Sequence, residues 1–167
     1  MTTTEPTALL ATAIRAIERR SFCTLATTSA QGRPHAAGVL YAAVGTTLYV
    51  STLRDSRKAR NVAENPRVAV TVPVRRLPVG PPGAVQFQGT AEVLPLDDPE
   101  LRELAAAGRI KSVTGHGELD LPGGCYLRIT PNRRLVTYAI GMSVVRVLRD
   151  PLNLAGSVEL PAARGAA

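Results

Sequence analysis

"TLRDSRKARNVAENPRVAVTV", residues 52–72, joins a dense polar segment to a regular alternation of valines. Seven of its first nine side chains are polar or charged, and its last five residues alternate valine with alanine or threonine. A period of two is typical of a strand with one buried face, so the stretch predicts a strand from Val68 to Val74. The polar part predicts a short helix over residues 56–64, because helices usually end before a pair such as Asn65-Pro66.

The residues before this stretch predict one helix and then three strands. Apolar residues at helical spacing follow Pro6, which a first helical turn tolerates, and they predict an amphipathic helix over residues 7–20. The period then changes to two. A three-strand meander is therefore expected, with turns at Ser29–Gly32 and Gly45 and with strands near residues 22–28, 33–43 and 46–52.

The segment that follows the valine strand is irregular, and a further strand comes after it. Residues 75–83 hold three prolines and two glycines, which predict a surface loop. In "AVQFQGTAEVL", residues 84–94, Val85 and Phe87 share one face of the expected strand, whereas Gln86 and Gln88 share the other.

The last third of the chain predicts a helix over Asp97–Ala107, since acidic residues suit a helix start. Residues 108–124 are rich in glycine and predict no regular element. Residues 125–140 predict a strand, a turn at Pro131-Asn132 and a final strand. A short helix is expected after residue 142, with a frayed end over the last ten residues.

These elements predict a mainly β fold with a few short helices. Many short strands with a meander near the front favour a small antiparallel barrel of about six to seven strands over a sandwich or a doubly wound sheet. A chain of 167 residues with 45% hydrophobic content suits one domain, residues 1–167, with a barrel core over residues 22–140. Neither a GxGxxG fingerprint nor a phosphate-binding GxxxxGK[ST] loop occurs, so a nucleotide-like ligand would need another kind of site.

Positive charge gathers around the opening stretch. The chain carries a formal charge of +7, and one segment supplies five of these charges, because seven basic residues there face only Asp55 and Glu64. The basic residues are Arg54, Arg57, Lys58, Arg60, Arg67, Arg75 and Arg76. An anionic partner is expected. Nucleic acid is not, because no arginine-rich recognition helix appears and aromatic residues make up only 4% of the chain.

A compact phosphate fits this cluster, and the start of the predicted helix offers a place for it. Ser56 is suited to cap the helix, which leaves the following backbone N–H groups free to meet an anion. Arg57 and Lys58 in the first turn are unfavourable for an isolated helix by some tenths of a kcal/mol, and a bound phosphate reverses that sign. Ser51 and Thr52 add hydroxyl groups that we expect to point at the same spot. A solvated basic turn is the alternative.

The pattern "LYVST…SRKARNVAENPRVAV" resembles the flavin-binding core of the pyridoxamine 5′-phosphate oxidase-like superfamily, the FMN-binding split barrels. The shared features are a strand that ends in a hydroxyl pair, S-R-K opening a helix, and N-P before the next strand. The resemblance runs from about Phe22 to Ile140 and implies a split β-barrel that forms a homodimer. It also implies one FMN in each interface groove and a small-molecule substrate.

The resemblance also assigns roles to individual residues. Ser51, Thr52, Arg57 and Lys58, at the helix capped by Ser56, would bind the FMN phosphate. The strand from Ala36 to Tyr41 would line the isoalloxazine ring, mainly through its backbone, with the contributing residues Ala37, Gly38, Val39 and Tyr41. Gln86 or Gln88 would hydrogen-bond the polar edge of the ring. Tyr41 and Tyr138 are candidate proton donors near the ring, or ordinary strand aromatics of a barrel core.

The sequence departs from the pyridoxamine phosphate oxidases proper. They carry a lysine where Tyr41 stands, and their C-terminal region has a tryptophan, whereas this chain has none. The ending "RITPNRRLVTYAIG" is instead similar to that of flavin/deazaflavin oxidoreductases in the same superfamily, many of which use coenzyme F420. The oligoglutamate tail of that cofactor could meet Arg54, Arg60, Arg75 and Arg76.

Three classes of function stay open on the sequence. An oxidoreductase that uses FMN is favoured by the S-R-K motif, and an F420-dependent reductase is its alternative. A non-catalytic flavin or deazaflavin carrier is the second class, and a basic protein that associates with nucleic acid is the third.

The remaining features concern metal binding, the two cysteines and the cellular location. No metal site is expected, because His35 and His116 lack ligand spacing, although His116 would be the ligand to suspect if the barrel bound haem. Cys23 and Cys125 are interpreted as small buried hydrophobes without a disulfide. The chain shows neither a membrane span nor the layout of a signal peptide, so a cytoplasmic protein without membrane association is expected.

Overall fold

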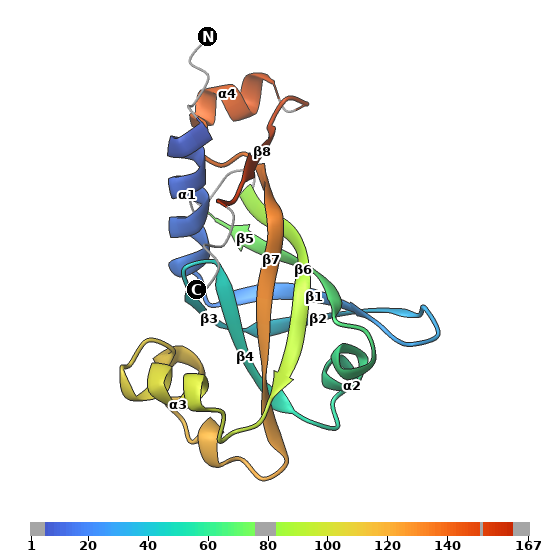
Figure 1. The fold of residues 1–167 in the computed structure, drawn as a ribbon. Coiled ribbons are helices and arrows are strands. Elements are labelled where there is room, and N and C mark those ends of the chain that lie inside the picture. Colours follow the sequence, from blue (N-terminus) through green and yellow to red (C-terminus); the bar gives the residue numbers. More distant parts are fainter. Residues whose placement is uncertain (1–5, 76–82, 151, 162–167) are drawn as a thin grey trace.

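The computed structural model describes residues 6–75, 83–150 and 152–161. Within these residues, eight antiparallel strands form one curled sheet in the order β2-β1-β5-β6-β7-β4-β3, with β8 beside β7 (Figure 1). The strands are β1 Phe22–Thr28, β2 Pro34–Leu40, β3 Ala42–Val44, β4 Thr47–Leu53, β5 Arg67–Val74, β6 Gly83–Leu94, β7 Gly124–Tyr138 and β8 Ala155–Glu159. The predicted fold class, a mainly β split barrel with a few short helices, is confirmed.

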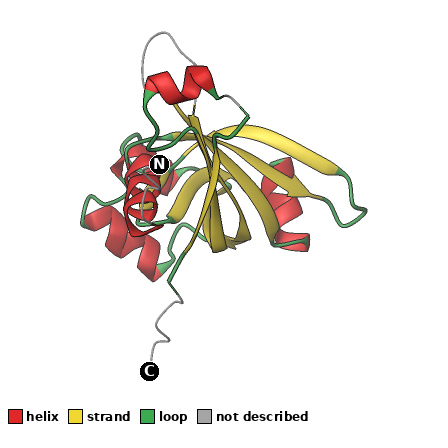
Figure 2. Ribbon diagram, turned by 90° about the horizontal axis from the view of Figure 1, so that it is seen from above, coloured by secondary structure: helices red, strands yellow, loops and turns green. Residues whose placement is uncertain are grey.

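The helices lie around the curled sheet, as the view from above shows (Figure 2). They are α1 Pro6–Glu18, α2 Arg57–Glu64, α3 Pro99–Ala106 and α4 Val144–Arg149. Two single 3-10 turns, Lys111–Val113 and Glu118–Asp120, interrupt the otherwise irregular segment predicted at residues 108–124. The helices at the N-terminus, after Ser56, after Asp98 and after Ser143 were all predicted, and each predicted bound lies within two residues of the observed one.

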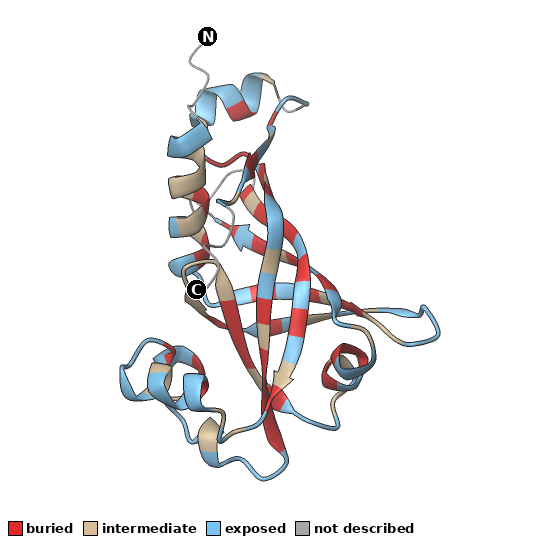
Figure 3. Cartoon of the chain, in the orientation of Figure 1, coloured by how far each residue is buried: buried red, intermediate tan, exposed pale blue. Residues whose placement is uncertain are grey.

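Buried and exposed residues alternate along the strands, which gives the sheet an inner and an outer face (Figure 3). The valines of β5 from Val68 to Val74 are buried, as are Val85 and Phe87 of β6. Gln86 and Gln88 are exposed on the outer face. From α1, Ala13 and Ile17 join the same core cluster, so this helix covers one side of the half-barrel.

The prediction of a single strand over residues 33–43 is wrong, because this segment forms two strands that are interrupted at Tyr41. Residues before the break pair with β1 at one edge of the sheet, and residues after it pair with β4 at the other. The three-strand meander is therefore two hairpins on opposite edges. Two hydrogen bonds fix Tyr41 where the chain passes from one edge of the sheet to the other. Its N–H donates to the Ser21 carbonyl at 2.8 Å, and its hydroxyl donates to the Ile17 carbonyl at 2.7 Å.

The predicted turn at Pro131-Asn132 is also wrong, since β7 is one strand of 15 residues. Proline is tolerated in a strand where no neighbour needs its N–H. β4 pairs with β7 only as far as Ile129, and β8 begins to pair at Arg134, so Pro131 lies in the gap between them. On its other side the pairing with β6 shifts between Phe87 and Gly89.

The C-terminal part contributes one strand that was not predicted. Residues 155–159 pair with β7, so the frayed end expected for the last ten residues is wrong at its beginning. Gly156 of β8 pairs with Thr137, and a Cβ atom at this position would lie 2.9 Å from the Thr137 hydroxyl oxygen. Most of the loop predicted at residues 75–83 lies outside the described residues.

Candidate functional site

The start of α2 has the geometry that the sequence predicted. Ser56 has extended backbone angles, φ −64° and ψ 149°, and its hydroxyl accepts the Ala59 N–H at 3.3 Å. The Thr52 hydroxyl lies 3.2 Å from that of Ser56 and so holds the cap against β4. The first turn contains no acidic residue. Because helix N-termini favour negative charge, this end of α2 can accept an anion.

Ser51 does not join Thr52 at this place. Successive side chains of a strand point to opposite faces, and Thr52 points to the face that carries α2. Ser51 pairs across the ladder with Tyr126, and its hydroxyl interacts with that of the tyrosine, whose pKa is raised by burial and lowered in part by Ser51. The expectation that both hydroxyl groups point at one spot is therefore wrong.

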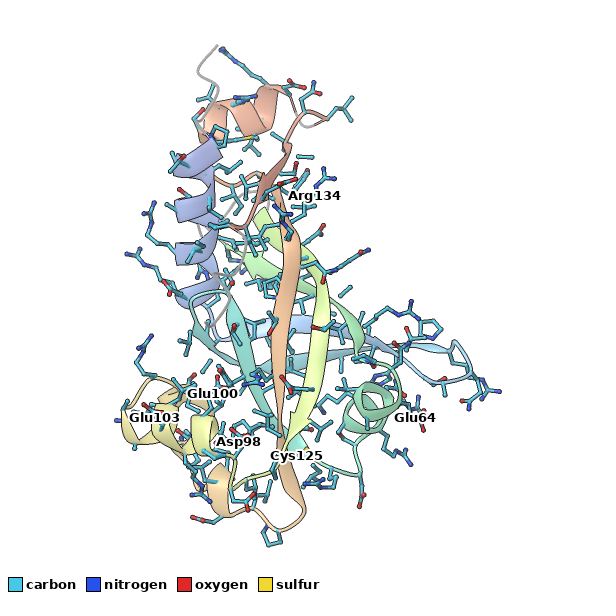
Figure 4. The ribbon with its side chains drawn as sticks, in the orientation of Figure 1. Glu64, Asp98, Glu100, Glu103, Cys125 and Arg134 are labelled. Atoms are coloured by element: carbon cyan, nitrogen blue, oxygen red, sulfur yellow. The ribbon has the colours of Figure 1, made fainter. Side chains whose placement is uncertain are left out.

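The two cations of the first turn lie on different sides of α2. Arg57 faces the β1–β2 hairpin and lines a cavity there. Lys58 lies toward the lower end of β7, where Cys125 is found (Figure 4). Burial raises the pKa of the Cys125 thiol, and the positive charges of Arg54 and Lys58 partly oppose the shift. An anion in front of the helix start would thus have one cation on either flank.

The cavity between the β1–β2 hairpin and α2, called here the hairpin cavity, has a volume of about 330 Å³. Its lining residues are Ser29, Gln31, Arg33, Pro34, His35, Arg57, Arg60, Asn61 and Glu64. Glu64, at the outer side of α2 in Figure 4, accepts the Ala30 N–H at 3.2 Å and ties the helix to the hairpin. The buried Asn61 amide donates to the Thr27 hydroxyl at 2.9 Å.

The sequence analysis did not predict this cavity, although the spacing of polar residues along α2 could have predicted one of its two walls. Arg57, Arg60, Asn61 and Glu64 follow helical spacing, which predicts a single polar stripe along α2. The contribution of the hairpin could not be predicted in this way, because it depends on how far β1 and β2 extend past the sheet.

A second and larger cavity, of about 770 Å³, lies over the outer face of β5, β6 and β7. This outer-face cavity is lined by Gln86 and Gln88 of β6, together with Ala69 and Thr71 of β5 and Val136 of β7. Arg134 also lines it and lies toward the end of β7 opposite to Cys125 (Figure 4). Arg57, which the resemblance assigns to the phosphate, thus lines the hairpin cavity, whereas Gln86 and Gln88, which it assigns to the ring edge, line the outer-face cavity.

The pairing between neighbouring strands places part of the predicted ring-binding strand on the same outer face of the sheet as Gln86. Gly38 pairs with Thr24, Thr24 with Thr71, and Thr71 with Gln86. Three strand spacings of about 4.8 Å put Gly38 and Gln86 about 14 Å apart on one row, with Thr24 and Thr71 between them. A Cβ atom at Gly38 would lie 2.8 Å from the Phe22 ring, so that ring covers the row at its edge. β2 is an edge strand of the described sheet, so every second residue along Ala37, Gly38 and Val39 leaves its backbone groups for a ligand.

Tyr41 lies in the core rather than on the outer face. The side chain is 0% exposed, and burial, followed by the nearby Cys23, raises the pKa of its hydroxyl above the ordinary value. Tyr138 is 39% exposed at the end of β7. The alternative interpretation of Tyr41, as an aromatic residue that fills the barrel, agrees with this position.

Glu100 of α3 is bound to the sheet through Arg128 and Tyr49. Arg128 forms ion pairs with Glu92 and with Glu100, which also accepts the Tyr49 hydroxyl at 2.5 Å. Figure 4 shows Glu100 on α3, across the sheet from Glu64. In the part of the chain that the structure describes, no three His, Cys, Asp or Glu side chains gather as a metal site requires. His116 is largely exposed and lies 3.5 Å from Glu118.

The chain is an antiparallel split barrel, and beside its sheet lies a capped helix start without acidic residues in its first turn. The sequence profile of the family described as pyridoxamine 5′-phosphate oxidase matches residues 10–137. The chain therefore belongs to the pyridoxamine 5′-phosphate oxidase family. A search among curated protein sequences finds no match.

Solved structures with the same fold come from proteins of different kinds. HutZ, the haem storage protein of Vibrio cholerae, superposes with a TM-score of 0.66 at 21% identity, over 76% of this chain and 92% of that one. A FAD-binding protein of Mesorhizobium loti gives 0.56 at 23% identity, over 71% and 84%. A protein described as an F420 reductase gives 0.50 at 21% identity, over 71% and 91%. At such identities the likeness shows the fold alone.

Proposed function

We propose that this chain is a flavin-dependent oxidoreductase that binds FMN and transfers hydride to or from a small organic substrate. The observation that carries the proposal is the start of α2, where a capped helix has no acidic residue in its first turn and has Arg57 and Lys58 on its two flanks. Family membership supports the same conclusion. Coenzyme F420 is the alternative cofactor, since it also carries a phosphate, and a non-catalytic flavin carrier is the alternative role.

The residues present fit a phosphate ester at this place. The free N–H groups of the first turn, the Thr52–Ser56 hydroxyl pair and the two cations supply donors for a dianion. When bound, the flavin supplies the hydride chemistry, and the protein positions it and excludes water. Gln86 or Gln88 would hold the polar edge of the ring, and the backbone of β2 would line it.

A homodimer is part of the proposal, because one chain leaves the site incomplete. The hairpin cavity and the outer-face cavity share no lining residue. A groove shared with a second copy would let the phosphate and the ring bind to different chains. Cys23 and Cys125 are buried and free, as suits a reducing compartment, and the proposal therefore places the enzyme in the cytoplasm. No helix of the described chain is long and apolar enough to cross a membrane.

Two measurements test the proposal. Mass spectrometry of the small molecule released on denaturing the native protein should identify FMN, or F420 for the alternative; release of haem alone would contradict both. Reoxidation of the reduced cofactor separates an enzyme from a carrier: candidate acceptors should accelerate it in the protein, whereas a carrier would show no acceleration.

A further inference from the structure

We infer that α4 and the turn after it form a docking surface for an anionic lipid bilayer. Aliphatic side chains of this surface enter the bilayer, and arginines beside them meet the lipid headgroups. The surface, called here the α4 patch, lies at the end of the molecule opposite to α2 and α3 (Figure 1). It consists of Val144, Val145, Leu148 and Leu152. The inference goes beyond the proposed oxidoreductase activity and does not depend on the flavin.

Large aliphatic side chains are exposed together in this short segment. Val144 is 43% exposed and Val145 56%, whereas Leu148 reaches 69% and Leu152 92%. Four of the nine exposed large apolar side chains in the described part of the chain fall within residues 144–152. A single exposed leucine is ordinary, but a group of neighbouring apolar side chains marks a surface that another molecule covers.

The packing of α4 keeps the patch facing outward. Val147 is buried in a small core cluster with Ala139 and Leu154, which anchors the helix to the end of the sheet. At about 100° per residue, Val145 lies almost opposite to Val147 on the helix, and Leu148 lies about a quarter turn from Val147. Neither side chain can therefore join the core cluster while Val147 occupies it.

The turn that follows α4 is also held in place. The Asp150 carboxylate accepts the Asn153 amide at 3.0 Å and 3.1 Å, and the Asn153 N–H donates to the Asp150 carbonyl at 3.3 Å. Leu152 lies between these two residues, so the same bonds support its exposed position.

Charge indicates what kind of partner covers the patch. Arg146 and Arg149 come from the same helix, and within the described ranges neither has an acidic group at ion-pair distance. The adjacent Asp150 is engaged with Asn153. A second copy of this chain on a two-fold axis would bring both pairs of arginines into one contact, where like charges repel. The arginines and the formal charge of +7 favour an anionic partner instead.

Among anionic partners, a bilayer suits the shape of the surface. Neither the hairpin cavity nor the outer-face cavity includes a residue of α4, whereas a peptide partner usually binds in a groove. A helix with an aliphatic face and neighbouring arginines can lie in the interface of a bilayer and attract anionic lipids. Such contact needs no spanning helix, so it is compatible with the absence of a span on which the expectation of no membrane association rested.

Co-sedimentation of the full chain with vesicles tests the inference. The vesicles contain either phosphatidylglycerol mixed with phosphatidylcholine or phosphatidylcholine alone. The chain should bind the mixed vesicles and lose most of this binding in about 0.5 M salt. Val145→Ser/Leu148→Ser should weaken partitioning about tenfold. Arg146→Gln/Arg149→Gln should weaken it about thirtyfold at low salt.

Two control variants make the same chemical changes elsewhere. Leu121→Ser removes an exposed leucine from the loop before β7. Arg109→Gln/Lys111→Gln removes two positive charges from exposed positions after α3. Both controls should bind the mixed vesicles nearly as the wild type does.

Several results would overturn the inference. The wild type might sediment with neither kind of vesicle, or the two charge variants could weaken binding equally, which would assign it to net charge. In sedimentation velocity without lipid, loss of a dimer in Val145→Ser/Leu148→Ser alone would assign the patch to contact between copies. Binding of an acidic amphipathic peptide through α4, without vesicle binding, would assign it to a protein partner.

FMN affinity separates this inference from the proposed function. Because α4 and α2 lie at opposite ends of the molecule, both α4 variants should bind FMN as the wild type does (Figure 1). A wild type that binds anionic vesicles but not FMN would contradict the proposed function and support the α4 patch. A wild type that binds FMN but not the vesicles would overturn the inference alone.

Discussion

Replacing Tyr41 by phenylalanine tests whether this tyrosine serves the fold or the chemistry. The hydroxyl of this fully buried side chain donates to the Ile17 carbonyl at 2.7 Å. Such a bond contributes about 1 kcal/mol net, and an unsatisfied buried partner can cost up to about 3 kcal/mol. Since the Ile17 carbonyl also accepts the Arg20 N–H at 3.3 Å, it keeps one partner, and the loss should be about 1 kcal/mol.

Urea and thermal unfolding, followed by far-ultraviolet circular dichroism, measure this loss. Tyr41→Phe should lower the melting temperature by about 2–4 °C for a chain of this size. Tyr138→Phe is the control, because its side chain is 39% exposed, and it should unfold as the wild type does. Both variants should keep their affinity for the cofactor. A Tyr41→Phe protein that is as stable as the wild type but turns over more slowly would refute the structural role.

Three further predictions concern the site, the sheet and the core. Ser56→Ala should lower the free energy of unfolding by about 1 kcal/mol, because it removes the cap of α2. Ser56→Asp should keep that stability but bind FMN more weakly, since it adds negative charge where the phosphate is proposed; equal FMN affinity in dialysis would argue against this position. Gly89→Ala should destabilise the protein by about 1–3 kcal/mol in urea titration, because its Cβ would lie 2.3 Å from the Thr130 carbonyl oxygen, and unchanged stability would contradict the close approach of the strands. Burial raises the pKa of the Cys23 thiol to about 12, so the folded state keeps a proton that the unfolded state releases above pH about 9. Stability should therefore fall as the pH rises from about 9 to 12, and thiol reagents at pH 8 should label Cys23 only after unfolding; rapid labelling of the native protein would refute this burial.

Local patterns predicted the elements whose signal lies within a few residues. The alternation from Val68 to Val74 requires only one buried face, and Ser56 requires only its position before the first helical turn. Both predictions are confirmed, because neither depends on a distant part of the chain.

Long-range pairing explains what the sequence did not show. The apolar residues on both sides of Tyr41 read as one strand, and the break becomes necessary only because the two halves pair at opposite edges of the sheet. Pro131 looks like a turn until the gap between the ends of β4 and β8 is known. β8 was missed because residues 155–159 become a strand only beside β7.

The candidate site was also predicted only where its residues are close together in the sequence. The cap at Ser56 and the adjacent cations follow from the sequence, and the separation of Ser51 from Thr52 could have been predicted from the period of two. The gathering of Arg33, His35 and Arg60 could not, because the hairpin and α2 are joined through a contact between Ala30 and Glu64, 34 residues apart.

The affinity of the protein for FMN relative to riboflavin, measured by equilibrium dialysis, tests the central claim most directly. The two ligands differ by the phosphate that the start of α2 is proposed to hold. The wild type should prefer FMN, and the Arg57→Ala/Lys58→Ala double variant should lose most of that preference while its affinity for riboflavin stays the same. A preference for FMN that is undiminished in the double variant would contradict the claim.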